Sequence, residues 1–257
     1  VLFRSIVSKP AGQATLERIL ERIRQCKKPV VGCFLGLQVQ LEGAGEHFHQ
    51  AKTIDDAVQL VLRHGQTNLN LEEGRNELTR QEIIRQEVAN WRQGQLYLRG
   101  LFAGGTFCYQ TQQVLRDAGI TAYSNAPLDK RYKLEHPEAS LEHSIIDLGD
   151  DHFTQGKPHP MIDATERRKR ILSEANDTET AILLLDFILG YVSSPNPVGD
   201  LIEAIKEAKA VVAGRGGCLT VVASICGTDQ DPQGLAHQKM LLEQANVHVF
   251  GSNFLAA

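Results

Sequence analysis

A glycine-rich turn follows an apolar segment in the middle of this 257-residue sequence. Residues 98–103 are mostly apolar, Gly104, Gly105 and Thr106 come next, and a helical pattern then begins. Backbone N–H groups at a helix N-terminus, with the helix dipole behind them, bind anions, and glycine lets a ligand approach the backbone closely. The pattern therefore indicates an anion site at these three residues. The alternative is a turn that only packs a helix onto a sheet.

Ionisable side chains are concentrated in residues 147–163. The segment holds four Asp, two His and one Lys, and such density at a strand end is typical of functional sites. We interpret Lys157 and His159 as groups that hold phosphate or carboxylate, and we add Asp151 to make the candidate catalytic set. The alternative is that His159 is an ordinary loop histidine. Carboxylates at 147, 150 and 151 also fit Mg²⁺, but no phosphate-binding Walker pattern accompanies them, so no metal site is predicted.

Polar residues follow two further predicted strands. Gly190 and Asn196 come after one strand, and Gly227 and Thr228 come after the next. Ligands of open α/β sheets bind at the carboxyl ends of the strands. These four residues therefore join the candidate anion- or phosphate-binding set.

Structural roles also account for part of this pattern. Thr106, Asn196 and Asp231 stand where helix caps are expected. Asp147 and Asp186 lie inside apolar runs, where a carboxylate accepts backbone N–H groups and serves only the fold. No serine or cysteine nucleophile with a paired base is visible in the sequence.

Alternating strands and helices from residue 96 onward predict a parallel α/β sandwich. The expected strands are 96–102, 144–148, 181–189, 218–226 and 247–250, and the expected helices are 106–117, 164–174, 197–210 and 232–244. Helices on both faces of a five-stranded parallel sheet make a flavodoxin-like, three-layer domain at 96–257. The polar stretch 124–142 is interpreted as an excursion from this pattern.

Residues 1–64 predict the tail of a second α/β domain. The same alternation of strands and helices is expected here: a strand end at 6–10, a helix at 11–25, a buried strand at 30–35 and a helix at 54–63. Residues 65–95 are expected to be a linker with a charged, solvated helix from about 79 to 91. Because the sequence starts with Val1 and stops in a helical pattern, we expect a fragment of a longer protein.

Composition excludes several classes of protein. A net charge of −4 argues against nucleic-acid binding. No apolar run reaches the ~18 residues of a membrane helix, and no signal peptide is visible, so a cytoplasmic protein is expected. Five cysteines without ligand spacing indicate reduced thiols rather than a metal site.

Five motifs in order resemble the FdrA family, acyl-CoA-synthetase-like proteins of the succinyl-CoA synthetase superfamily. They are Gly-Leu-Phe-Ala-Gly-Gly-Thr, Ile-Ile-Asp-Leu-Gly-Asp-Asp, Gly-Lys-Pro-His-Pro-Met-Ile-Asp, Leu-Leu-Leu-Asp-Phe-Ile-Leu-Gly-Tyr and Gly-Thr-Asp-Gln-Asp-Pro-Gln, beginning at residues 100, 145, 156, 183 and 227. The resemblance implies a CoA-ligase domain at 96–257, and at 1–64 the end of a domain like that of the synthetase α-subunit.

The resemblance also implies an activity and its partners. FdrA-like proteins are linked to allantoin and purine breakdown, where a complex of several subunits converts oxalurate and phosphate to oxamate and carbamoyl phosphate. We therefore expect a small anionic substrate, partner subunits or a homodimer, and no cofactor in these residues. CoA or a nucleotide would bind through an upstream domain of the family that this sequence lacks.

Two other functions stay open. One is an acid–thiol ligase that uses CoA, as in succinyl-CoA synthetase. Against it, residues 43–49 lack the Gly-His-Ala-Gly segment that carries a phosphorylated histidine in those enzymes. The other is a non-catalytic scaffold domain, which the dense polar loops argue against.

Overall fold

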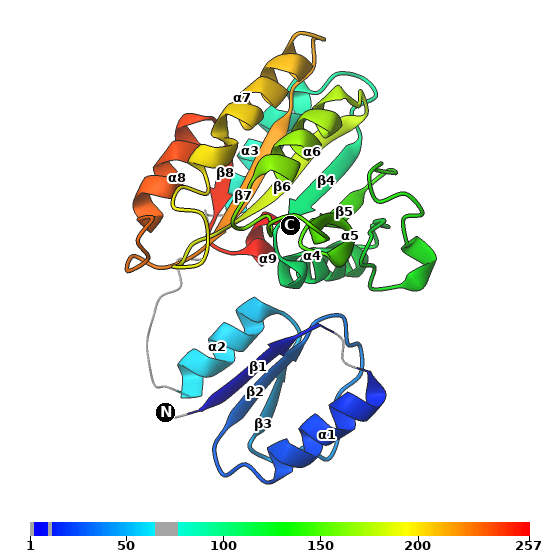
Figure 1. Cartoon of the computed structure of the whole chain (residues 1–257). Helices are drawn as coiled ribbons and strands as arrows, with labels where there is room; N and C mark the ends of the chain where they lie inside the picture. Colours follow the sequence, from blue (N-terminus) through cyan, green and yellow to red (C-terminus); the bar gives the residue numbers. More distant parts are fainter. Residues whose placement is uncertain (1–2, 10–11, 65–76) are drawn as a thin grey trace. The chain divides into compact units, whose positions relative to one another are not determined.

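The computed structural model describes residues 3–9, 12–64 and 77–257 (Figure 1). The chain divides into two compact units, Val1–Leu71 and Glu72–Ala257. No helix within the described ranges is both long enough and apolar enough to cross a membrane.

The first unit is a small parallel sheet with the order β1-β2-β3. Its elements are β1 (Arg4–Ser8), α1 (Gln13–Arg24), β2 (Val30–Phe34), β3 (Phe48–Ala51) and α2 (Ile54–His64). The central strand β2 is entirely buried, as its apolar run predicts. The sequence analysis missed β3, because Phe48-His-Gln-Ala51 contains too few apolar residues to read as a strand.

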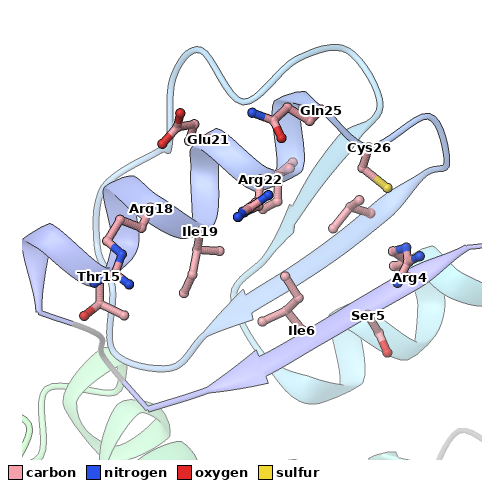
Figure 2. Close-up of a pocket in the computed structure, with 12 residues that line it drawn as sticks. Arg4, Ser5, Ile6, Thr15, Arg18, Ile19, Glu21, Arg22, Gln25 and Cys26 are labelled. Carbon is pink, nitrogen blue, oxygen red and sulfur yellow. The ribbon is translucent and has the colours of Figure 1, made fainter.

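A groove of about 1010 Å³ lies between α1 and β1, the edge strand of this sheet (Figure 2). Ile6 and Ile19 contribute to its apolar part, and Arg4, Arg18 and Arg22 add positive charge. The edge of the first unit is therefore lined by both apolar and cationic side chains.

The second unit is a parallel sheet with the order β5-β4-β6-β7-β8, which is the flavodoxin-like order. The strands are β4 (Tyr97–Phe102), β5 (Ser144–Asp147), β6 (Thr180–Ile188), β7 (Thr220–Cys226) and β8 (His248–Phe250). The main helices are α4 (Gly105–Asp117), α6 (Thr165–Asn176), α7 (Gly199–Ala213) and α8 (Leu235–Gln244). The predicted α/β sandwich is confirmed, with each strand and helix near its expected range.

Alternation along β6 divides the core between the two faces of the sheet. Leu183, Leu185 and Phe187 join the cluster that includes residues of α6, α7 and α8. Leu184 joins Phe102 and other residues beside α4, and the short helix α9 (Asn253–Ala256) lies on the same side as α4 (Figure 1). Both faces of β6 are therefore buried, which explains its continuous apolar sequence.

The helix α3 (Glu77–Asn90) packs against the amino ends of β7 and β8. The carboxylate of Glu87 accepts a hydrogen bond from Thr220 Oγ1 (2.6 Å) and contacts His248 Nε2 (2.9 Å). Trp91 Nε1 donates to the same Thr220 oxygen (3.0 Å). The expectation of a solvated charged face is therefore wrong at Glu87, because distant strand residues supply its partners.

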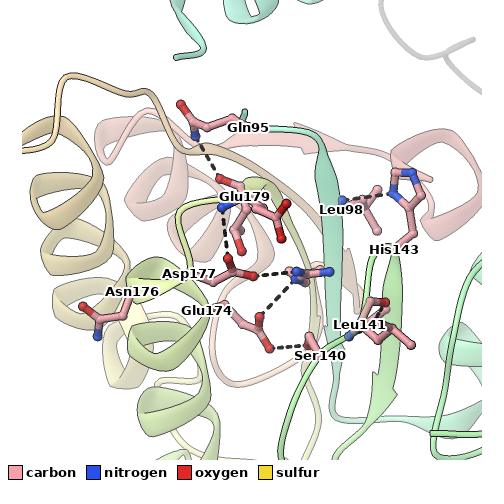
Figure 3. Close-up of polar contacts among 12 residues, drawn as sticks. Gln95, Leu98, Ser140, Leu141, His143, Glu174, Asn176, Asp177 and Glu179 are labelled. Atoms are coloured by element: carbon pink, nitrogen blue, oxygen red, sulfur yellow. Dashed lines mark hydrogen bonds and ion pairs between the residues drawn. The ribbon is translucent and has the colours of Figure 1, made fainter. Parts of the chain in front are cut away.

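A buried charge network fastens the polar excursion to the sheet (Figure 3). Arg99 of β4 is 1% exposed, and its guanidinium contacts Asp177 (2.6 Å) and Glu174 (3.2 Å). Glu174 also accepts from Arg170 Nε (2.5 Å) and from Ser140 Oγ (2.6 Å). The excursion at 124–142 is thereby tied to α6 through its Ser140 end.

One of the three expected helix caps is formed. Asn196 caps the start of α7, because its Oδ1 accepts the Gly199 N–H (3.1 Å) and its carbonyl oxygen accepts the Asp200 N–H (3.0 Å). Helix α4 is preceded by Gly104, so Thr106 lies inside the helix. Asp231 accepts the Thr228 N–H (2.6 Å) in a turn before α8, which begins at Leu235.

Candidate active site

The glycine turn after β4 is held by a buried carboxylate from the neighbouring strand β6. Asp186 Oδ1 accepts the Ala103 N–H (2.8 Å), and Asp186 Oδ2 accepts the Gly104 N–H (3.2 Å). Asp186 is completely buried. Asp186 therefore accepts backbone N–H groups, as predicted, and the N–H group of Gly104, a predicted anion donor, already has an internal acceptor.

Arg167 of α6 is the cation that accompanies Asp186. Its Nη2 donates to Asp186 Oδ1 (3.0 Å) and to the carbonyl oxygens of Leu101 (2.9 Å) and Asp186 (2.8 Å). Burial lowers the pKa of Arg167, and the Asp186 charge opposes that change. Burial raises the pKa of Asp186, while Arg167 and the N–H groups of Ala103 and Gly104 lower it. Every one of these contacts favours the ionised pair.

The sequence analysis missed Arg167, although a signal was present. Arg167, Arg170, Ile171 and Glu174 are all buried on one stripe of α6, at helical spacing. Charged residues at positions that the period assigns to the core indicate buried ion pairs. Their partners lie in other elements and cannot be read from the period.

His159 packs beside the glycine turn. A Cβ placed on Gly149 would lie 2.6 Å from His159 Nε2, 2.7 Å from the Ala103 carbonyl oxygen and 3.2 Å from Asp147 Oδ1. The Met161 N–H is directed at His159 Nδ1 (3.3 Å), so the neutral ring carries its proton on Nε2. The structure thus brings His159 together with the turn and with Asp147, whose Oδ1 accepts the Gly149 N–H (3.0 Å).

Lys157 and Asp151 lie apart from this arrangement. Lys157 Nζ contacts Glu166 Oε2 (3.0 Å), and the lysine side chain is 51% exposed. Asp151 is exposed in the short helix α5 (Asp151–Thr154). Within the described part of the chain, no side-chain contact joins either residue to His159 or to the turn. Of the candidate catalytic set, the structure places only His159 there.

The loop that carries Gly190 is clamped by a buried glutamine. Gln233 Oε1 accepts the Gly190 N–H (3.1 Å), and its Nε2 donates to the carbonyl oxygens of Gly190 (2.7 Å) and Ser194 (3.0 Å). Asn196 Oδ1 accepts from the side chain of Gln238 (3.2 Å) as well as from its own turn. The polar groups of Gly190 and Asn196 therefore hold their own loop.

Gly227 and Thr228 are engaged in the same way. A Cβ on Gly227 would lie 2.6 Å from Leu189 Cδ1, so close packing accounts for the glycine. Thr228 donates its N–H and its hydroxyl to Asp231. The structure brings neither residue into contact with His159.

Further backbone donors at this edge belong to the first turn of α4. The first intrahelical bond of α4 runs from the Cys108 N–H to the Gly104 carbonyl (3.3 Å). The N–H groups of Gly105, Thr106 and Phe107 come before it, where a helix has no internal acceptor to offer. These three N–H groups are therefore the donors that the turn can offer to an oxyanion.

A small cavity lies beside Ala103, the residue before the turn. Its volume is about 10 Å³, roughly the space of one water molecule. Ala103, Met161, Arg167 and Ser194 are among its lining residues. Arg167 is 3% exposed, and its Nε–H has no acceptor among the described residues. A residue that lines this small cavity therefore carries a buried donor without an acceptor.

Comparison with known protein families shows that residues 101–257 match the CoA-ligase family. Over 252 residues the chain is 39% identical to the uncharacterized protein YahF of Escherichia coli (strain K12), covering 97% of this chain and 48% of YahF. Among solved structures, PH0766 from Pyrococcus horikoshii OT3 matches with a TM-score of 0.40 and 13% identity, over 98% of this chain and 49% of that one. The chain spans about half the length of YahF and about half that of PH0766.

Proposed function

This chain belongs to the CoA-ligase family, and we propose that its second unit binds a small oxyanion in front of α4, beside His159. The observation that carries the proposal is the approach of His159 to the glycine turn, across Gly149. In this proposal, a proton on Nε2 and the N–H groups of the first α4 turn bind the same oxyanion from two different loops. Such preorganised donors stabilise an oxyanion that develops during acyl transfer.

We propose carbamoyl transfer, within an oxamate carbamoyltransferase-type complex, as the reaction. A phosphate oxygen attacks the carbamoyl carbon of oxalurate, the C–O bond forms, and the C–N bond to oxamate breaks. The leaving nitrogen takes the electron pair of that bond and a proton, which His159 Nε2–H is placed to donate. Each well-placed N–H donor contributes about 3 kcal/mol to stabilising the tetrahedral oxyanion.

An acyl-CoA ligase is the second candidate, because the family match favours it. The same donors would then stabilise the oxyanion formed when a CoA thiol attacks an acyl phosphate. The first unit argues against a phosphohistidine relay at its own histidines. His47 Nε2 contacts the Ile23 carbonyl oxygen (2.7 Å), and His49 packs against His64 with ring centroids 4.2 Å apart. Both rings are occupied by contacts that serve the fold.

Thermal unfolding in the presence of candidate ligands tests these proposals. Phosphate, carbamoyl phosphate, oxamate, CoA and ATP-Mg are added in turn, since a ligand at ~100 times its dissociation constant adds ~2.7 kcal/mol of stability. Protection by oxamate or carbamoyl phosphate, without CoA, supports carbamoyl transfer. Protection by CoA and nucleotide supports the ligase. No protection by any ligand would contradict a site in this chain and favour a scaffold.

A histidine pair supplies the matched variants. His159→Phe should abolish protection by oxamate, because it keeps a ring but removes the N–H donor beside the turn. His152→Phe should retain it, because His152 lies in the same segment but pairs with Glu138 (2.6 Å) near the surface. Equal protection of both variants would show that His159 is not part of the site.

A further inference from the structure

At the outer edge of β5, a side chain takes the place of a neighbouring strand. β5 is an edge strand of its sheet, and the Leu148 N–H donates to the Phe102 carbonyl oxygen of β4 (2.9 Å). The backbone groups of Asp147 face the other way, where Asn125 meets them. Asn125 Oδ1 accepts the Asp147 N–H (2.9 Å), and Asn125 Nδ2 donates to the Asp147 carbonyl oxygen (3.0 Å). One amide therefore pairs with both backbone groups of the last residue of β5.

Asparagine suits this contact because its short side chain ends in one acceptor and one donor. Ionised aspartate has the same shape but offers acceptors only, so an oxygen would replace the donor that faces the Asp147 carbonyl oxygen. Alanine would offer neither group. Asn125 is half-buried, so substitutions here change the contact without opening the core.

The segment that carries Asn125 is fixed on both sides. Before it, the completely buried Ser124 donates its N–H to the Tyr132 carbonyl oxygen (3.0 Å). After it, Gln112 of α4 donates to the Ala126 carbonyl oxygen (3.1 Å). Gln112 belongs to the helix whose first turn carries the proposed oxyanion donors. Asn125 thus links that helix to the end of β5.

The turn that follows Asp147 supports the ring of His159. Asp147 Oδ1 accepts the Gly149 N–H (3.0 Å), which closes the turn. A Cβ on Gly149 would lie 2.6 Å from His159 Nε2, so this end of the ring rests on the Gly149 Cα. The other ring nitrogen, Nδ1, is held within its own loop by the Met161 N–H (3.3 Å). Gly149 therefore supports the Nε2 end from outside the histidine's loop.

We infer that Asn125 is a positioning residue of the candidate site, which holds the turn at Asp147 and Gly149 where it supports His159. The contacts of Asn125 stand on the structure alone, while its effect on an oxyanion rests on the proposed function. A donor works only when its support keeps it close to the productive geometry. Asn125 supplies that support through Gly149 and does not touch the ligand itself.

Nuclear magnetic resonance of the whole chain tests the hold on His159 without any ligand. The ring C–H protons on both sides of Nε2 should give a strong cross-relaxation signal with the Gly149 Hα protons, and His159→Phe identifies that signal. Asn125→Asp should lose most of it, because the ionised carboxylate cannot donate to the Asp147 carbonyl oxygen. Asn176→Asp removes the same kind of donor from a carbonyl oxygen at the exposed end of α6 and should keep the signal.

Calorimetric titration with oxamate then tests the role of this support in binding. Asn125→Asp should raise the dissociation constant about tenfold, which is the worth of one hydrogen bond to a charged group. Asn176→Asp should leave it unchanged. If Asn125→Asp does not fold, Asn125→Ala takes its place, since alanine removes both contacts without adding a charge. Failure of both variants to fold would make Asn125 a residue of the fold and overturn the inference.

The outcomes separate this inference from the proposed function. A wild-type cross-relaxation signal in folded Asn125→Asp would overturn the inference, whatever the affinity for oxamate. Loss of the signal with unchanged oxamate binding would also overturn it, because the position of His159 would then not matter to the site. If the wild-type chain itself bound no oxamate, the proposed site would be refuted, while loss of the signal would still support the hold of Asn125 on the ring.

Discussion

Replacing Gly149 by Ala tests whether His159 is held against the glycine turn. The new Cβ would lie 2.6 Å from His159 Nε2 and 2.7 Å from the carbonyl oxygen of Ala103. Neither distance is tolerable for carbon, and the second involves backbone that is part of the turn. The imidazole and the turn must therefore move apart, and we expect a loss of about 1–3 kcal/mol in the free energy of unfolding, as for other overpacked sites.

Gly104→Ala is the matched control. A Cβ there would meet its nearest atom, Asp186 Oδ2, at 3.7 Å, which is ordinary contact. Gly104 has φ of −126° and ψ of 125°, an extended conformation that alanine adopts readily. Because alanine also lowers the entropy of the unfolded chain, this variant should match the wild type within about 1 kcal/mol.

Urea unfolding and oxamate titration of both variants provide the assay. We expect Gly149→Ala to bind oxamate at least tenfold more weakly, and Gly104→Ala to bind it within threefold of the wild type. If Gly149→Ala kept wild-type stability and affinity, the packing of His159 on the turn would be refuted. If Gly104→Ala were equally damaging, the turn would need glycine for a reason other than space.

Two further predictions concern the supports of the site. Glu174→Ala should lower the free energy of unfolding by about 3–5 kcal/mol, because it leaves the buried Arg170 without its acid and takes one of two acids from the buried Arg99. The exposed Glu203→Ala should change it by less than about 0.5 kcal/mol in the same urea titration. Burial raises the pKa of Glu87, but hydrogen bonds from Thr220 and His248 outweigh it, so the net pKa lies below its ordinary 4.5. Its contribution to stability is therefore present above that pH and is lost as the pH falls through the lowered pKa. Glu87→Gln should flatten this acid-side loss by less than about 1 kcal/mol, since the side chain is 24% exposed, and unfolding at a series of pH values measures it.

Most elements of the second unit could be predicted from the sequence. A strand buried on both faces needs apolar residues at successive positions, and the run at 181–189 has them. Polar, glycine-rich loops after such strands mark the carboxyl edge of the sheet, where the site lies. The strand β3 was missed, because Phe48-His-Gln-Ala51 owes its structure to pairing with β2 and not to its own composition.

The candidate site was predictable as a region but not as a set of contacts. Lys157 and His159 are two residues apart, and nothing local distinguishes them. In the structure His159 packs on Gly149, while Lys157 pairs with Glu166. The direction of each side chain depends on how the loop leaves α5 and enters α6, which is decided by packing across the whole edge.

Residue patterns within short windows predict the α/β class, the parallel sheet and the edge at which polar loops gather, because burial imposes a period on the sequence. Tertiary structure alone decided which donors meet which acceptors. Asp186 finds the N–H groups of Ala103 and Gly104 across 82 or more residues of chain, and Arg167 reaches it from a helix laid over the sheet. Hydrogen bonds act over about 3 Å, so their partners are chosen only once the distant segments have packed together.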